Sequence, residues 1–546
     1  MDDTNRRIFL KQLLSTLGYS LLPSNISAKT KTTDINYVQI NIAGGPSRWS
    51  FDNPIAPLVG SSYVPHPMIV NNFSNTGPIA SLAGLDYQRF KVNDWYMPQF
   101  WKDKLLTSTG EVQASSLLNN CLIVRGCHMR NDGHSLNNRK LSAPIPGGSS
   151  ITGLLADKMG EKLFPSINLV GDSGVEAVAG GAFKSKENSI QINTPQNDKN
   201  PLSYLLSPFL ISKPHKARWL HLIKEELGEV GLRNYKKMLQ DFNKRVTEYQ
   251  RIINFSLDAS YYTSIGERPV QGADLKAIKE GRVDPTLAKY LNYDFLIGNS
   301  DFRTILVKAK VKNLAEQFAT AELLLTHGLC GNITINVNTV SNLFYENSIA
   351  NDKFSREILS VGSTQLSYKG GNDRYTGAKH LNNFQLDSHD TGLLPNIFLT
   401  HALFKSISSC LAEFKLNLEG KSLYDKTFIH LASEFDRDPR ADCSGSEHGW
   451  NGHISSFYSG SIKGLKVVGN IFTQSPGDSY YTKNGTWGQG APVKENGNRP
   501  ISYGNIASSL ANVLNIESPS PNDRPLFERK AGKVNSFINE VKNIDS

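Results

Sequence analysis

Two long segments with helical spacing of apolar residues are each followed by a short apolar run of β type. Residues 302–327 form the first helical pattern, which ends at Gly328, and the apolar run 332–337 follows it. Residues 396–418 form the second helical pattern, and the run 427–432 follows that one. Because parallel strands need a crossover, usually a helix, between them, this order predicts an α/β protein built on a parallel sheet.

Two further strands are expected in the N-terminal third of the chain. Residues 37–42 alternate and are rich in β-branched side chains, and they run into the Gly-rich turn Ala43–Ser47, with Asp52 just beyond it. Residues 120–124 are a second apolar run, which ends at Arg125 and is followed by a polar loop that carries His134. In α/β sheets, sites commonly lie where such strands end.

A pair of serines precedes the helix that we expect at residues 151–159. Ser149 and Ser150 follow two glycines at the start of this helix. Serine in this position is most often an N-cap. It can also serve as a nucleophile or as part of an anion cradle, because a helix N-terminus stabilises negative charge.

The length of the chain allows a large core. The chain has 546 residues, of which 39% are hydrophobic and 20% charged, as expected of a globular, loop-rich protein. We expect one α/β domain over residues 29–546, with a mainly helical segment at about 205–328 and an insertion or lid at about 341–383. Residues 471–500 are expected to form a loop, residues 501–514 a short amphipathic helix, and the tail beyond that helix is expected to be peripheral.

The N-terminus is similar to a twin-arginine export signal. Thr4 to Lys11 contains Arg6, Arg7 and Phe9 in the register of such signals, and a modestly apolar stretch and a plausible cleavage site at residues 26–28 follow. Residues 1–28 are therefore expected to be a signal peptide, recognised by the twin-arginine export machinery and directing the protein to the periplasm or cell envelope of a bacterium. The alternative is a cytosolic amphipathic helix. The stretch is too short and polar to span a bilayer, and no transmembrane segment is expected elsewhere.

Charge and cysteine content restrict the remaining classes of function. The net charge of +9 is spread along the chain without a long Lys/Arg block, so we do not expect nucleic acid as a partner. Five cysteines without CxxC spacing argue against a structural zinc ribbon. An exported location permits a disulfide, and Cys121 and Cys127 are the nearest pair.

Acids and histidines recur at the ends of the predicted strands or in the loops that follow them. Mixed oxygen and nitrogen ligands of this kind suit one or two divalent metal ions, with Zn²⁺ or Mn²⁺ favoured and Ca²⁺ or Mg²⁺ as alternatives. The alternative is a solvated polar loop that happens to contain histidines. In the metal-binding interpretation, His453 is expected to support a ligand or to contact substrate and not to bind the metal itself. The residues concerned are Asp387, His389, Glu434, Glu447 and His448.

The chain resembles the bacterial family catalogued as domain of unknown function 1501, which is sulfatase-like and belongs to the alkaline phosphatase-like superfamily. The resemblance covers most of the chain in order, including the Arg6-Arg7 leader. The similar motifs are Ala43–Ser47 with Phe51–Pro54, Val124-Arg125 with His134, Leu386–His389, Ser433–Arg437, Gly445–Gly449 and Ser459–Gly464. The chain departs from the family's motifs in lacking a tryptophan before Asp387, in carrying Asp436 after Phe435, and in carrying Glu447 before His448.

The resemblance implies a central, mostly parallel sheet flanked by helices, with one or two metals at the C-terminal ends of its strands. It implies hydrolysis or transfer of phosphate or sulfate esters in a small molecule, glycan or lipid. By position, Asp387, His389, Glu434 and His448 would be metal ligands and Asp52 a possible fifth, while Arg125 and His134 would lie near the substrate. The nucleophile stays open among Ser47, Ser135, Ser149 and Ser150. The alternative is a catalytically degenerate member that acts as a cell-envelope binding or assembly protein.

Overall fold

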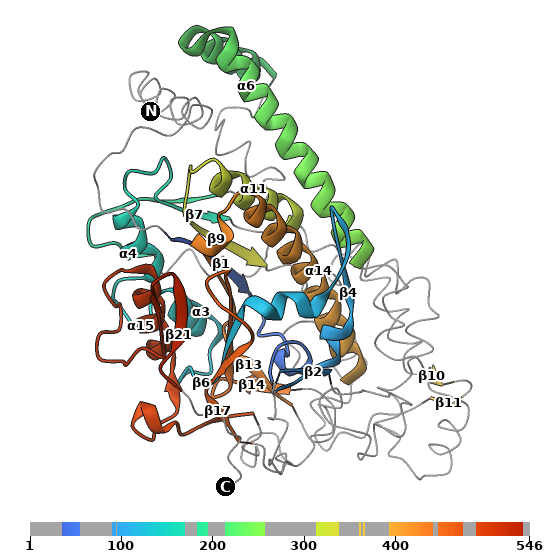
Figure 1. The fold of residues 1–546 in the computed structure, drawn as a ribbon, viewed down its shortest axis with the longest axis vertical. Coiled ribbons are helices and arrows are strands. Elements are labelled where there is room, and N and C mark those ends of the chain that lie inside the picture. The colour runs from blue at the N-terminus through green and yellow to red at the C-terminus, as the bar shows by residue number, and fades with distance from the viewer. Residues whose placement is uncertain are drawn as a thin grey trace.

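The computed structural model describes residues 35–54, 90–93, 95–169, 183–194, 213–256, 313–337, 360–361, 364–365, 393–439, 446–472 and 488–538. A nine-stranded sheet lies at its centre, in the order β16-β6-β15-β12-β1-β9-β7-β8, with β19 paired to β6 (Figure 1). The strands are β1 (Asn36–Ile42), β6 (Cys121–His128), β7 (Ser166–Leu169), β8 (Gln191–Asn193), β9 (Asn332–Val337), β12 (Thr427–Ser433), β15 (His453–Tyr458), β16 (Lys466–Val468) and β19 (Ile501–Ser502).

The sheet is mixed but mostly parallel, because β15 is the strand that runs against the others. It pairs antiparallel with both β12 and β6, whereas the remaining pairs in the sheet are parallel. The C-terminal ends of β1, β6, β9 and β12 therefore lie at the same edge. The predicted α/β class is confirmed, and the runs expected at 37–42, 332–337 and 427–432 are β1, β9 and β12.

Strand β6 extends further than the expected run at 120–124. Residues 125–128 belong to the strand as well, and Cys127 and His128 pair with Ile501 and Ser502 of β19. Gly126, at φ +67°, lies so close to the main chain of Asn470 that a Cβ atom there would approach its carbonyl oxygen to 2.3 Å. The strand continues because a segment far along the chain supplies its hydrogen-bond partners.

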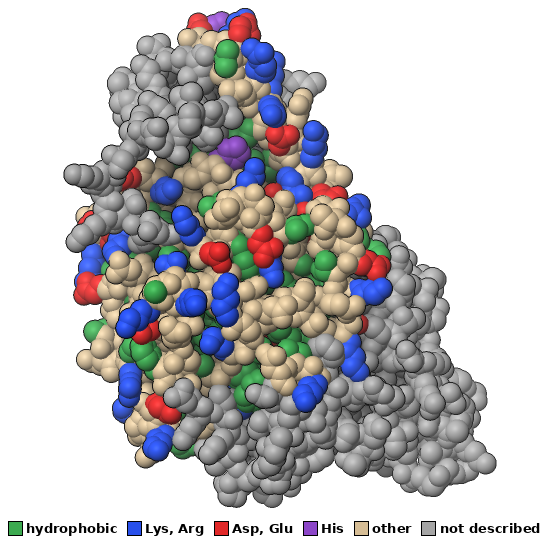
Figure 2. Space-filling model, in the orientation of Figure 1, with side chains coloured by type: hydrophobic (Ala, Val, Ile, Leu, Met, Phe, Trp, Pro, Cys, Tyr) green, Lys and Arg blue, Asp and Glu red, His purple; other side chains and the backbone are tan. Residues whose placement is uncertain are grey.

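Helices α6 (Lys213–Ser256), α11 (Leu314–Thr326) and α14 (Leu393–Gly420) lie on one side of the sheet, with part of α6 reaching beyond the body of the protein (Figure 1). The guanidinium of Arg245 on α6 joins the three helices. It donates to both carboxylate oxygens of Glu322 on α11, at 2.7 and 2.8 Å, and to Glu413 on α14 at 2.7 Å. On the face shown in Figure 2, basic side chains are scattered among acidic ones.

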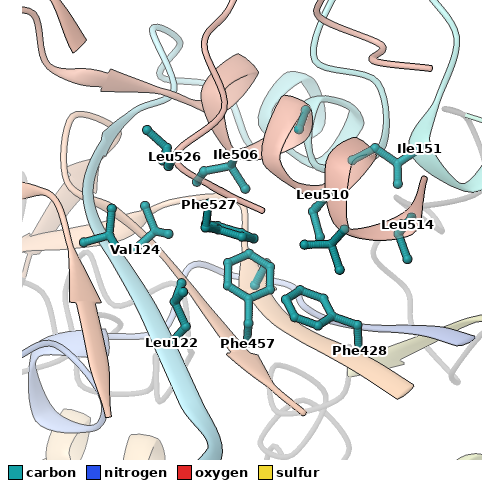
Figure 3. Close-up of a cluster of buried hydrophobic side chains, with 14 of the residues drawn as sticks. Leu122, Val124, Ile151, Phe428, Phe457, Ile506, Leu510, Leu514, Leu526 and Phe527 are labelled. Carbon is teal, nitrogen blue, oxygen red and sulfur yellow. The ribbon is translucent and has the colours of Figure 1, made fainter. Parts of the chain in front are cut away.

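Helices α3 (His134–Ser142), α4 (Ile151–Lys158) and α15 (Tyr503–Leu514) lie on the other side, together with the hairpin β20 (Phe527–Lys530) and β21 (Lys533–Ser536). Their apolar side chains pack on the sheet around Phe428 and Phe457 (Figure 3). The ring of Phe527 lies 5.3 Å from that of Phe457 and is fully buried. The expectation that the tail beyond residue 514 is peripheral is therefore wrong, because this hairpin completes the core.

Several short two-stranded sheets are separate from the central sheet. Residues 471–500, expected to be a loop, contain part of one of them and a 3-10 turn, η10 (Lys494–Asn496). Of the helices that the structure describes, none is both long and apolar enough to cross a bilayer. The hairpins are β2 (Phe90–Val92) with β3 (Trp95–Met97), β4 (Lys104–Thr107) with β5 (Gly110–Gln113), β10 (Ser360–Val361) with β11 (Thr364–Gln365), β13 (Asp436–Pro439) with β14 (Ser446–Gly449), and β17 (Asn470–Ile471) with β18 (Gly490–Ala491).

The cysteines that the structure describes carry free, buried thiols. Cys121 and Cys127 stand at the first and seventh positions of β6. Six residues of extended chain span about 20 Å, which is far beyond the reach of a disulfide. These two cysteines therefore do not pair with each other in this fold, and Cys443 lies outside the described residues.

Candidate functional site

The candidate site begins where β12 and β1 end side by side. Glu434 follows the last residue of β12 and is fully buried. Its Oε1 accepts a hydrogen bond of 2.7 Å from the main-chain N–H of Gly44, just beyond β1. Gly45 has φ +54°, and a Cβ atom there would lie 2.5 Å from the ring of Phe435. Glycine at this turn therefore lets the main chain approach the residues that follow β12.

His134 holds the same carboxylate oxygen from the other side. It is the first residue of α3, and its Nδ1 lies 2.7 Å from Oε1 of Glu434. The sequence predicted His134 near the site, but it did not predict contact with Glu434. Of the two oxygens of the Glu434 carboxylate, Oε1 thus has two partners. Oε2 is buried and has no hydrogen-bond partner among the described residues.

The hairpin β13–β14 brings His448 beside His134, the imidazole that contacts this carboxylate. The sequence placed Glu447 and His448 in a loop, whereas both lie in β14, with Arg437 of β13 opposite His448. The His448 ring stacks on Phe435 at 4.4 Å and meets the His134 ring edge-on at 4.5 Å. Arg437 fixes the hairpin to the turn after β1, because its Nε donates to the carbonyl of Gly45 at 2.6 Å.

Asp132 determines which ring nitrogen of His448 carries the hydrogen. The sequence pattern did not identify this residue. His448 Nδ1 lies 2.7 Å from the Asp132 carbonyl oxygen and 2.8 Å from its carboxylate. A carbonyl oxygen can only accept, so Nδ1 carries the hydrogen and Nε2 of the neutral ring is the acceptor. Histidines that bind metals are commonly held in this way. The signal that could have identified Asp132 is its position two residues before His134 in the polar loop after β6.

Asp52, predicted as a possible fifth metal ligand, is engaged elsewhere. Its carboxylate is fully buried and forms an ion pair with Arg48, whose Nε donates to Oδ1 at 2.7 Å. Its Oδ2 accepts from Arg48 and from the hydroxyl of Ser456. Both oxygens therefore have protein partners.

Arg125, predicted to lie near the substrate, is fully buried within β6. Its Nε donates to the carbonyl of Gly469 at 3.1 Å, and it also donates to the carbonyl of Pro54. Its guanidinium lies over the ring of Trp95 at 4.9 Å. These contacts hold the main chain around β6 together.

The four serines proposed as nucleophiles lie in different settings. Ser150 is buried and caps α4, accepting from Gly153 N–H at 2.8 Å and from Lys184 N–H at 3.1 Å, so the N-cap interpretation is confirmed for it. Ser149 is partly exposed beside it, and Ser135 is exposed on α3. Ser47 is buried at the start of a 3-10 turn, η1 (Arg48–Ser50).

The remaining predicted ligands, Asp387 and His389, lie outside the described residues. Within the part of the chain that the structure describes, no three His, Cys, Asp or Glu side chains are grouped closely enough to hold a metal ion. Apart from Asp52, which is paired with Arg48, Glu434 and His448 are thus the described members of the predicted ligand set. The unpartnered Oε2 of Glu434 is the feature that fits a cation.

Additional acids lie on the hairpin. Burial raises the pKa of Asp436 to about 7, with a smaller contribution from the charge of Asp52. Burial also raises the pKa of Asp438 to about 7, and the charges of Glu447 and Asp436 add smaller increases. Glu447 lies opposite Asp438 in the hairpin β13–β14. Two carboxylates directly opposite each other repel when both are ionised.

The fold and this site together define an α/β protein with an acid–imidazole group at the C-terminal edge of a mostly parallel sheet. No protein-family model matches the chain, and no curated protein matches it.

Proposed function

We propose that this protein is an exported, metal-dependent hydrolase of phosphate or sulfate esters. The observation that carries the proposal is the Glu434 carboxylate, whose Oε1 is held by Gly44 N–H and His134 while its buried Oε2 lacks a described partner. A buried carboxylate oxygen without a partner is costly unless a cation or a donor occupies its position.

Glu434 and His448 would hold a divalent cation, Zn²⁺ or Mn²⁺ by their donor types, with Asp387 and His389 as the further ligands that the resemblance implies. When bound, the cation would supply positive charge for an anionic ester oxygen and activate water. The chain's own residues orient the ligands: His134 and Gly44 fix one oxygen of Glu434, and Asp132 keeps the proton of His448 on Nδ1. Such supporting contacts commonly change metal affinity by about 10–100-fold.

Export is part of the proposal. It rests on the Arg6-Arg7 leader, which lies outside the described residues, and it places the mature protein in the periplasm or cell envelope. The substrate would be a small-molecule, glycan or lipid ester.

A second candidate function is a degenerate member that keeps the fold and acts in cell-envelope binding or assembly. Two observations favour it. The hydroxyl of Ser150 is used as a helix cap, and Arg125 is buried against main-chain carbonyls. Neither residue is arranged to attack or bind an ester.

The two functions are separated by metal analysis and turnover of the purified, exported protein. Bound Zn or Mn together with hydrolysis of an aryl phosphate or aryl sulfate is the expected result. Glu434→Gln should abolish both, whereas Glu517→Gln, at an exposed acid far along the chain, should change neither. Bound metal without turnover of either ester would support the binding function, and absence of metal in the wild type would overturn the metal site itself.

A further inference from the structure

Four polar side chains form a continuous hydrogen-bonded chain inside the sheet. The hydroxyl of Tyr37 lies 2.9 Å from His430 Nδ1, and His430 Nε2 lies 3.0 Å from the hydroxyl of Ser455. That hydroxyl lies 2.9 Å from Nε2 of His453. All four side chains are fully buried, and we refer to these four residues as the relay.

The relay crosses three neighbouring strands, since Tyr37 is on β1, His430 on β12, and Ser455 and His453 on β15. Ser455 lies opposite Ala432, two residues before Glu434. The pairing of β15 with β6 shifts register between His453 and Ser455, so the backbone ladder is irregular where the relay ends. Side-chain hydrogen bonds hold the strands together at this point.

The donors of the relay fix its direction. Ser455 has one hydroxyl hydrogen and stands between two imidazole nitrogens, so it donates to one of them and accepts from the other. The Tyr37 hydroxyl lies 2.9 Å from His430 Nδ1 and 3.4 Å from Gln39 Oε1. We assign its hydrogen to the shorter contact, which leaves the ring hydrogen of His430 on Nε2, facing Ser455. Ser455 then donates to His453 Nε2, and the hydrogen of His453 is on Nδ1. Nδ1 has no well-formed hydrogen bond among the described residues, but the main chain of Ser433 favours a proton on this ring.

Both imidazoles must be neutral for this arrangement, and their surroundings keep them so. Burial lowers the pKa of His430 to about 3, and the charge of Arg48 adds to the effect. Burial likewise lowers the pKa of His453, with further contributions from Arg48 and His430. The described side chains that contact or face the two imidazoles are uncharged: Tyr503 meets His453 edge-on at 5.5 Å, Phe457 stacks on His430 at 4.5 Å, and Cys127 lies opposite His453.

We propose that Tyr37, His430, Ser455 and His453 are positioning residues for the candidate site: their relay fixes the end of β12 against β15 and thereby sets the direction of the Glu434 carboxylate. The inference rests on the proposed function only in treating Glu434 as a ligand. The relay depends on Ser455, because its hydroxyl forms hydrogen bonds with both histidines.

The test uses the full chain with Ser455→Ala and Ser455→Thr, of which the second keeps the hydroxyl. Selective ¹⁵N labelling of histidine should show His430 protonated on Nε2 and His453 on Nδ1 in the wild type. Hydrogen exchange of the Gly44 amide, which donates to Glu434 Oε1, reports the position of the carboxylate without metal. Ser455→Ala should speed that exchange about 10-fold, and Ser455→Thr should restore it.

A core variant outside the relay separates positioning from simple destabilisation. Phe527→Ala weakens the same core far along the chain, and it should leave Gly44 exchange closer to the wild-type rate than Ser455→Ala does. Zn²⁺ titration should show about 10-fold weaker binding in Ser455→Ala. The same tautomer at both histidines, or unchanged Gly44 exchange in Ser455→Ala, would overturn the relay. A wild type that binds no Zn²⁺ overturns the proposed function instead, while the exchange and tautomer results still decide the relay.

Discussion

The imidazole of His134 and the carboxylate of Glu434 are 300 residues apart in the chain, yet Nδ1 of the one lies 2.7 Å from Oε1 of the other. The contact exists because α3 begins at the edge of the sheet where β12 ends. It leaves Oε2 of Glu434 as the oxygen that the proposed cation would contact.

His134→Ala should weaken Zn²⁺ binding by about 10–100-fold, because Glu434 loses one of the two groups that orient it. Isothermal titration of the full chain measures the affinity. Leu136→Ala, at an exposed position on the same helix, is the matched control and should bind like the wild type. Equal affinity in His134→Ala would remove His134 from the site.

Asp52→Asn should destabilise the protein by about 3–5 kcal/mol, since it leaves the buried guanidinium of Arg48 without its counter-charge. Urea unfolding gives the stability and elemental analysis gives the metal content, which we expect to be unchanged. Loss of metal with little loss of stability would instead restore Asp52 as a ligand.

Stability should fall as the solution is acidified from about pH 6.5 towards pH 3. The pKa of His430 is lowered to about 3 in the folded protein, so the unfolded chain binds more protons across this interval. The contribution of neutral His430 to the free energy of unfolding is fully present above pH 6.5. It falls by about 1.4 kcal/mol for each pH unit between pH 6.5 and the pKa of His430 in the folded protein. Unfolding curves at several pH values should show a shallower dependence for His430→Gln, and an unchanged slope would contradict this role.

Asp438→Asn should raise stability by about 1–2 kcal/mol at pH 8 and leave it unchanged at pH 4. Because the pKa of Asp438 is raised to about 7, mainly by burial, the wild-type side chain is most favourable when protonated. Its contribution is present below about pH 4 and is lost as the pH rises through 7. Thermal unfolding at both pH values measures the difference, with Asp425→Asn as an exposed control.

Phe527→Ala should cost about 3–5 kcal/mol, as expected for a large aromatic residue removed from a core. The ring is fully buried and packs on Phe457 and Phe428. Lys533→Ala, at an exposed position in the same hairpin, should change stability by less than about 0.5 kcal/mol. Equal stabilities of the two variants by urea unfolding would mean that the hairpin lies outside the cooperative core.

Local patterns were sufficient for most of the sheet and much less so for the site. The runs at 37–42, 332–337 and 427–432 are strands as predicted, because alternation and apolar content reflect burial on a pleated surface. The sequence pattern assigns His448 to a loop. A strand of a short hairpin is recognised by its partner strand, and the partner here, β13, is too polar to show a strand pattern. Asp132 was missed because its only signal is proximity to His134 in the chain.

The sequence by itself determined the α/β class, the main strands and helices, and the place of Glu434 at the end of a strand. Only the tertiary structure decided which partner each buried charged side chain has. It paired Asp52 with Arg48, tied Arg125 to carbonyls, and brought His134 to Glu434. The physical reason is that backbone periodicity acts over a few residues, whereas partners of a buried charge are set by strand order and register across the whole sheet.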